Sequence, residues 1–107
     1  MKPHDRIAQD LPFLTAFRQD LHAHPELGFE EVYTAGRVAQ ALRLCGVDQV
    51  HTGIGKTGVV GVLRNGSSSR TLGIRADMDA LPIIENTGAS YTSQHAGCMH
   101  ACGHDGH

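Results

Sequence analysis

The hydrophobic pattern of the chain changes its period near Gly46, and this change constrains the fold most. Before Gly46, apolar residues recur at the three- and four-residue spacing of an α-helix. After it, Val59–Leu63 and Thr71–Ala76 are short, rich in β-branched residues and bounded by Gly or Ser, as is typical of β-strands. Two helices followed by strands indicate an α/β or α+β fold.

The first helix is predicted over about Leu11–Ala23. Asp10 is a suitable N-cap, and Pro12 is tolerated because it would fall in the first turn. The helix is expected to end before Pro25, because a residue that precedes proline avoids the helical region of backbone space.

The second helix is predicted over about Glu30–Cys45. Its apolar stripe consists of Phe29, Val32, Ala35, Val38, Ala39, Leu42 and Cys45. Glu30 and Glu31 would lie in the first turn, where the helix dipole favours anions, and Gly46 would end the helix. Because Cys45 belongs to the stripe, it is expected in the core.

Val59–Leu63 and Thr71–Ala76 are predicted to pair as an antiparallel hairpin, because the linker Asn65–Ser69 between them is short. A weaker strand is predicted over Asp48–His51. The segment Gly53–Gly58 has the pattern G-x-G-x-x-G, but a dinucleotide-binding fingerprint must open a helix, and here a strand follows. The segment is therefore interpreted as a glycine-rich turn between strands.

Charge and hydropathy exclude several classes of partner. Nine basic and eleven acidic residues give a formal charge of −2, without a basic block, which argues against nucleic acid. No apolar run approaches the roughly 18 residues of a membrane span, and the first residues lack the apolar region of a signal peptide. A soluble, cytoplasmic protein with no membrane partner is therefore expected.

Histidine and cysteine are concentrated at the C-terminal end of the chain. Four of the eight histidines and two of the three cysteines lie within the last 13 residues. Cys102 and His104 stand two apart across Gly103, so an extended backbone would project both side chains to one side. A thiolate and an imidazole are donors that zinc, nickel or cobalt accept. The alternative is a buried, reduced cysteine beside solvent-exposed histidines.

A self-contained zinc module is a second interpretation, from a different class of function. Cys98, Cys102, His104 and His107 would together close a tetrahedral site within ten residues. In such a module, Cys98→Ala and Cys102→Ala would weaken metal binding equally, whereas a site belonging to a larger enzyme would not need Cys98.

Two further polar pairs each have a functional and a structural interpretation. Asp77 and Asp79 lie at the end of a predicted strand, where one carboxylate would orient a metal-bound histidine or help hold a cation. The alternative is an acidic turn in which Asp79 caps local N–H groups. His22 and His24 lie at the end of the first helix, where the dipole favours surface histidines over ligands.

Four segments resemble, in order and in separation, the N-terminal part of a known enzyme family. They are Asp20–Glu31, Thr57–Gly61, Ile74–Pro82 and Met99–His107. The family comprises the metal-dependent amidohydrolases of the hippurate hydrolase, N-acyl-amino-acid deacylase and auxin-conjugate hydrolase branch of the aminoacylase–carboxypeptidase clan. The resemblance covers nearly the whole chain after about residue 11, and Met99–His107 is its most specific motif.

The resemblance implies an α/β fold, the incomplete N-terminal part of a zinc-peptidase-like catalytic domain with two helices followed by a mixed β-sheet segment. Residues 1–107 would form one portion of a single metallohydrolase domain, without its C-terminal half or a dimerisation domain. Family members carry a Glu-Glu pair and two further histidine ligands in those parts. The chain is therefore expected to be a truncated fragment, inactive alone, with a homo-oligomer only in the full-length protein. A third, structural interpretation makes it the partner of a complementary piece.

The resemblance also implies the chemistry of the full-length enzyme. Cys102 and His104 match the family's metal ligands, and Asp79 matches its orienting catalytic carboxylate, while Asp77 stands where the wider clan has a histidine ligand. Two divalent ions (zinc, manganese, nickel or cobalt) are expected, with a small N-acyl amino acid such as hippurate, or a dipeptide, as the substrate. A metal-bridged water would attack the amide carbonyl, and a glutamate would act as the general base.

Overall fold

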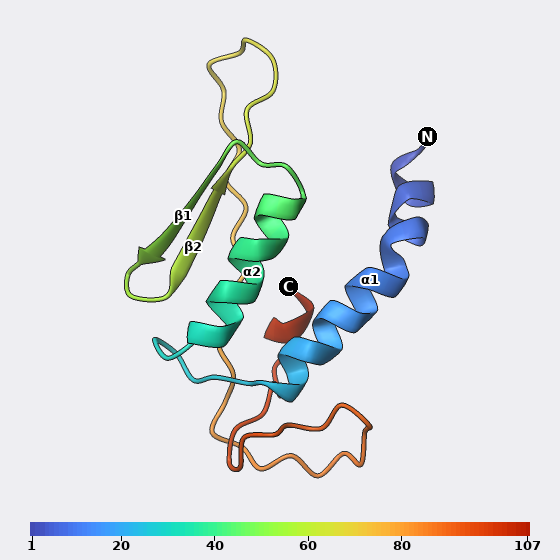
Figure 1. Cartoon of the computed structure of the whole chain (residues 1–107), viewed down its shortest axis with the longest axis vertical. Coiled ribbons are helices and arrows are strands. Elements are labelled where there is room, and N and C mark those ends of the chain that lie inside the picture. The colour runs from blue at the N-terminus through green and yellow to red at the C-terminus, as the bar shows by residue number, and fades with distance from the viewer.

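The computed structural model describes residues 1–107, which form two helices, a two-stranded sheet and one short 3-10 turn. Its radius of gyration is 15.4 Å, above the roughly 13 Å of a compact chain of this length. Figure 1 shows the reason, since the start of the first helix projects from the body and the chain after the sheet forms long loops at both ends. Neither helix combines the length and the apolar character that crossing a membrane requires.

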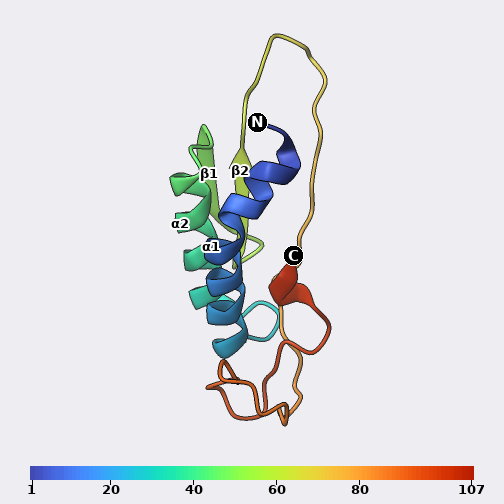
Figure 2. The ribbon, with the colours of Figure 1, turned by 90° about the vertical axis from the view of Figure 1, so that its right-hand side faces the viewer.

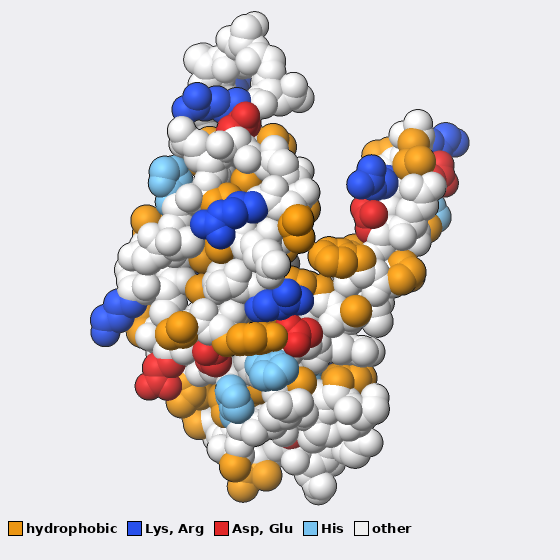
Figure 3. All heavy atoms as spheres, viewed as in Figure 1, with side chains coloured by type: hydrophobic (Ala, Val, Ile, Leu, Met, Phe, Trp, Pro, Cys, Tyr) orange, Lys and Arg blue, Asp and Glu red, His pale blue; other side chains and the backbone are white.

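Helix α1 spans Pro3–Ala23 and starts well before the predicted Leu11. Its N-cap is Lys2, so the predictions of Asp10 as the cap and of Pro12 in the first turn are wrong. The early turns carry no buried side chain, and the hydrophobic side chains visible on the projecting arm in Figure 3 are exposed. Because helix propensity rather than packing forms these turns, the hydrophobic pattern did not reveal them. The predicted end before Pro25 is confirmed.

Helix α2 spans Val32–Leu44, with Glu31 as the N-cap and Cys45 as the C-cap. Gly46 follows with a φ of 80°, as expected of the residue that ends a helix. Glu30 and Glu31 precede the helix, so the predicted acidic first turn is absent. The negative charge at this helix end comes instead from Glu26, in the loop before the helix.

The middle of the predicted apolar stripe packs against the sheet. Ala39 is buried, and the methyl groups of Leu42 lie so close to Gly61 that a Cβ there would approach them to 3.2 Å. The prediction of Cys45 in the core is wrong, because its side chain is exposed. As the C-cap residue, Cys45 lies where the chain leaves the helix, so the face that packs on the sheet ends before it.

Strands β1 (Gln49–Ile54) and β2 (Gly58–Val62) form an antiparallel hairpin in which Gln49 lies opposite Val62. The three residues between the strands confirm the glycine-rich segment as a turn. Helix α2 covers one face of this hairpin, as Figure 1 shows. Together the helices and the sheet confirm the α/β class, with the sheet limited to two antiparallel strands.

The predicted pairing of Val59–Leu63 with Thr71–Ala76 is wrong. The partner is instead the strand predicted weakly over Asp48–His51, while Thr71–Ala76 runs along the molecule without a strand partner (Figure 2). Both linkers are short, but the turn that forms has only three residues, and closing a shorter loop costs less conformational entropy.

The rest of the chain is held at the end of α1 by a few hydrogen bonds. Leu81 and Met99 form an isolated antiparallel bridge, and the amide of Ala80 donates to the Glu26 carbonyl at 2.8 Å. The His95 Nδ1–H donates to the Pro25 carbonyl at 2.8 Å. The buried residues gather mostly at this junction: Leu21, His22, Ala23, Pro25, Glu31, Thr34, Ala39, Ala80, Cys98, His100 and Asp105.

Candidate functional site

The candidate site lies where the loop that contains Asp79 meets the 3-10 turn η1 (His104–Gly106). The His104 Nδ1–H donates to the Asp79 carboxylate at 2.9 Å and faces the Asp79 carbonyl oxygen at 3.2 Å. Because both partners are acceptors, Nδ1 carries a proton, and in the neutral form of the ring the Nε2 lone pair is free. A carboxylate that holds a histidine in this way is the usual outer partner of a metal-binding imidazole.

Asp77 lies on the other side of the same imidazole, with its Oδ2 atom 4.0 Å from His104 Nε2. Its other oxygen accepts a hydrogen bond from Arg75 Nε at 2.9 Å. That bond is the main cause that lowers the pKa of the Asp77 carboxyl, and the charge of Arg75 adds to it. An ionised carboxylate therefore stands near the free ring nitrogen.

Gly103 separates the two predicted ligands and shapes the turn between them. Its φ of 96° lies in the left-handed region that favours glycine, so the backbone is not extended here as the sequence argument assumed. The Cys102 thiol is exposed, whereas the His104 ring is half-buried against Asp79. The two donors that this chain supplies, an exposed thiol and an oriented imidazole, suit a divalent transition metal.

The structure does not gather Cys98, Cys102, His104 and His107 as a zinc module. No three His, Cys, Asp or Glu side chains are arranged to hold a metal ion. Cys98 is buried, and this burial raises the pKa of its thiol, with the charges of Glu26 and Glu30 adding to the effect. The thiolate form that a metal needs is therefore disfavoured at Cys98.

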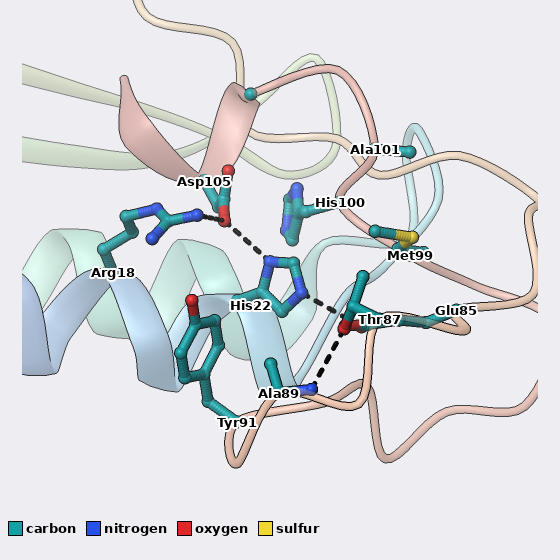
Figure 4. Close-up of a pocket in the computed structure, with 11 residues that line it drawn as sticks. Arg18, His22, Glu85, Thr87, Ala89, Tyr91, Met99, His100, Ala101 and Asp105 are labelled. Carbon is teal, nitrogen blue, oxygen red and sulfur yellow. Dashed lines mark hydrogen bonds and ion pairs between the residues drawn. The ribbon is translucent and has the colours of Figure 1, made fainter.

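A second polar cluster, which sequence reasoning missed, surrounds His22. The interpretation of His22 as a surface residue is wrong, because the residue is only 5% exposed. Its Nδ1 lies 2.8 Å from Asp105 Oδ2 and its Nε2 lies 2.9 Å from Glu85 Oε1, as Figure 4 shows. Arg18, one helical turn earlier, also contacts Asp105, at 3.3 Å. The four-residue spacing of Arg18 and His22 was the available signal.

The ionisation of this cluster follows from its hydrogen bonds. Burial favours the neutral form of Glu85, but hydrogen bonds from Thr87, from the Ser93 amide and from His22 outweigh it, so the pKa of Glu85 is lowered. A cavity of about 300 Å³ adjoins this cluster, and His22, Glu85 and His100 all line it. Neither ring nitrogen of His100 has a hydrogen-bond partner. Desolvation is the main cause that lowers the pKa of His100.

Glu26, also missed as a functional side chain, satisfies the N-terminus of α2. Its carboxylate accepts from the Tyr33 amide at 2.9 Å and from the Thr34 amide and hydroxyl at 2.7 Å each. Glu31, the N-cap, makes no capping bond and instead accepts from the Thr57 hydroxyl at 2.5 Å. The loop after α1 thereby fixes the start of α2. The backbone carbonyl of Glu26 in the same loop accepts from the Ala80 amide, one residue before the bridge between Leu81 and Met99.

Proteins with similar sequences include several that are named as hydrolases. The hippurate hydrolase of Campylobacter jejuni is 56% identical over 90 residues, which are 84% of this chain and 23% of that protein. An N-acetyldiaminopimelate deacetylase from Bacillus cytotoxicus is 43% identical over 90 residues, which are 84% of this chain and 24% of that protein. The chain thus spans about a quarter of the length of these relatives.

Solved structures and a family model agree with these relatives. An aminohydrolase from methicillin-resistant Staphylococcus aureus matches with a TM-score of 0.86 and 43% identity, over 94% of this chain and 27% of that one. The YXEP protein of Bacillus subtilis, described as a dinuclear metal binding peptidase, matches with a TM-score of 0.84 and 40% identity, over 90% of this chain and 27% of that one. The family model matches residues 73–107, which include both Asp79 and His104. This model is that of peptidase family M20/M25/M40, and the chain is similar by sequence and by fold to proteins that include a dinuclear metal binding peptidase of the M20 family.

Proposed function

We propose that the chain is part of a metal-dependent hydrolase that cleaves the amide bond of a small N-acyl amino acid or a dipeptide. The observation that carries the proposal is the hydrogen bond from His104 to Asp79, at 2.9 Å, which leaves the ring's Nε2 free. The exposed thiol of Cys102, two residues before His104, is the second proposed ligand. Relatives named for the hydrolysis of hippurate and of an N-acetyl group support this class of reaction.

Each proposed residue has a separate task in this hydrolase. Cys102 and His104 would hold a metal ion, and Asp79 would keep the imidazole in the tautomer and orientation that binding requires. When bound, a divalent metal supplies Lewis-acid polarisation of an amide carbonyl and lowers the pKa of water. The ionised carboxylate of Asp77 adds negative charge beside the imidazole, which favours a cation there.

The proposal requires further ligands from a longer protein. A catalytic zinc needs three protein donors and an open position, and this chain supplies two. We therefore propose that residues 1–107 are the N-terminal portion of a single catalytic domain with two divalent metal ions, zinc, manganese, nickel or cobalt. The remaining donors would come from the parts that the relatives have and this chain does not span.

A chimeric enzyme tests the proposed activity. The matching quarter of the Campylobacter hippurate hydrolase is replaced by this chain, and release of glycine from hippurate is measured. Hydrolysis is expected that a chelator abolishes and that zinc, manganese, nickel or cobalt restores. A chimera with Cys45→Ala, which changes an exposed cysteine outside the site, should remain active. A folded chimera that binds metal yet hydrolyses neither N-acyl amino acids nor dipeptides would contradict the proposal.

The variant Asp79→Asn tests the proposed orienting role. An amide still accepts the hydrogen bond from His104 but lacks the charge that raises the basicity of the ring, so metal affinity should fall about tenfold. Competition with a chromogenic chelator measures this change. Asp48→Asn is the matched control, because Asp48 accepts from the Arg64 amide, outside the site. All of these affinities are measured in the chimera, and equal affinity with and without Asp79→Asn would exclude the role.

A further inference from the structure

A buried row of alternating charges connects α1 to the turn that carries His104. It runs from Glu85 through His22 to Asp105 and ends at Arg18. The side chains of Glu85 and Asp105 are only 2% and 3% exposed, whereas Arg18 reaches solvent. Three of the four members are thus withdrawn from water, where each unpaired charge would be costly.

The geometry fixes how many protons His22 carries. Ionised carboxylates only accept hydrogen bonds, and each ring nitrogen of His22 faces one, Nδ1 at 2.8 Å from Asp105 and Nε2 at 2.9 Å from Glu85. When both carboxylates are ionised, both nitrogens donate and His22 is an imidazolium. Two cations, Arg18 and His22, then balance two carboxylates, and the row is neutral as a whole.

No other charged group competes for His22 within this cluster. Tyr91 meets the His22 ring edge-on, with the ring centroids 5.3 Å apart, and the His100 ring lies 6.4 Å away in a tilted arrangement. His100 makes no hydrogen bond, so it neither donates to nor accepts from the row. In Figure 4 the carboxylate of Asp105 points at His22 from the side of η1.

The row bears on the candidate metal site through the η1 turn. Asp105 directly follows His104, and both belong to the same 3-10 turn. The His104 imidazole is held by Asp79, whereas the neighbouring carboxylate is held by residues of α1. The turn is therefore fixed at two adjacent side chains by two separate parts of the chain, and His22 makes the shorter of the two α1 contacts.

We propose that His22 is a positioning residue for the metal site: as a doubly donating imidazolium between Glu85 and Asp105, it fixes the turn that presents His104. This inference rests on the proposed function only for the ligand role of His104. The protonation of His22 and the order of the turn can be measured on the chain without any metal.

Nitrogen NMR of the unmodified chain tests the imidazolium directly. Long-range proton–nitrogen correlation near pH 7 should show both His22 nitrogens protonated. The His22 signal is assigned as the one that is missing from the spectrum of His22→Gln. A neutral-tautomer pattern, with one nitrogen unprotonated, would overturn the inference.

A set of variants tests the positioning role. His22→Gln leaves the row with one uncompensated negative charge, so exchange of the Gly106 and His107 amides, which close the turn, should accelerate. In the chimera with the Campylobacter hippurate hydrolase, the cobalt(II) affinity should fall about tenfold, as for outer partners of metal ligands. Adding Glu85→Gln restores neutrality and should recover most of both losses. The control is His24→Gln, because His24 lies at the same helix end but donates to the Asp20 carbonyl.

The outcomes separate this inference from the proposed function. Unchanged amide exchange in His22→Gln, or a double variant no better than His22→Gln, would overturn the positioning role. If the chimera with the Campylobacter hippurate hydrolase shows no cobalt–thiolate absorption, the proposed metal site fails. Amide exchange that still depends on His22 would in that case support its hold on the turn.

Discussion

In the chimera with the Campylobacter hippurate hydrolase, Cys102→Ala is expected to lower the affinity for zinc or cobalt by more than about 100-fold. The thiolate is a direct donor, so its removal should exceed the roughly 10–100-fold loss seen for outer partners of metal ligands. Because Cys102 is exposed, its replacement removes no packing contacts, so the loss of affinity reports the loss of the thiolate donor alone. Cobalt(II) titration followed by thiolate-to-metal absorption measures the affinity, which should also fall as the pH falls, since binding releases the thiol proton.

Cys98→Ala is the matched control for this experiment. Cys98 is buried and the pKa of its thiol is raised, so its removal should change stability but leave the metal affinity within about twofold of the unmodified chimera. Equal losses of affinity in Cys98→Ala and Cys102→Ala would contradict the enzyme site and support the self-contained zinc module.

Glu26→Ala is expected to lower the free energy of unfolding by about 2–3 kcal/mol, the largest stability effect anticipated for a single side chain here. The carboxylate satisfies two amides and a hydroxyl at the start of α2, and no side chain of the helix's own N-cap replaces it. Urea unfolding followed by circular dichroism measures the change. Hydrogen exchange should show that the Tyr33 and Thr34 amides lose their protection.

Glu30→Ala provides the control for Glu26. Glu30 is exposed in the same loop, so its removal should change the stability by no more than about 0.5 kcal/mol. Glu26→Gln keeps one acceptor oxygen and should fall between the two. Equal stabilities of Glu26→Ala and Glu30→Ala would show that the carboxylate is not the cap of α2.

The parts of the fold that sequence could predict are those in which local pattern and packing agree. The middle of α2 packs on the hairpin with its apolar stripe, and Gly46 ends it. The early turns of α1 escaped prediction because they bury nothing. The pairing of Val59–Leu63 was misassigned because two short linkers competed, and local pattern does not rank them.

In the candidate site, too, the sequence revealed the residues that form a local motif and missed a contact between distant segments. The pair Cys102 and His104 was visible as a motif, and Asp79 does meet His104 in space. The role of His22 was hidden, because its partner Asp105 lies 83 residues away in the chain. Glu26 was missed for another reason: its partners are only 7 and 8 residues away, but it lies outside the helix that it caps. His22 is buried only because Asp105 and Glu85, both distant in the sequence, pack against it.

The long separation between His22 and its partners has a consequence for the order of folding. Helix α2 and the hairpin involve neighbouring segments and close early, whereas the contact between His22 and Asp105 closes a loop of nearly the whole chain. During synthesis, His22 therefore remains solvated and without its Asp105 partner until residue 105 has emerged. Assembly of the candidate metal site should accordingly be the slowest step of folding and the first to fail when the C-terminal turn is removed.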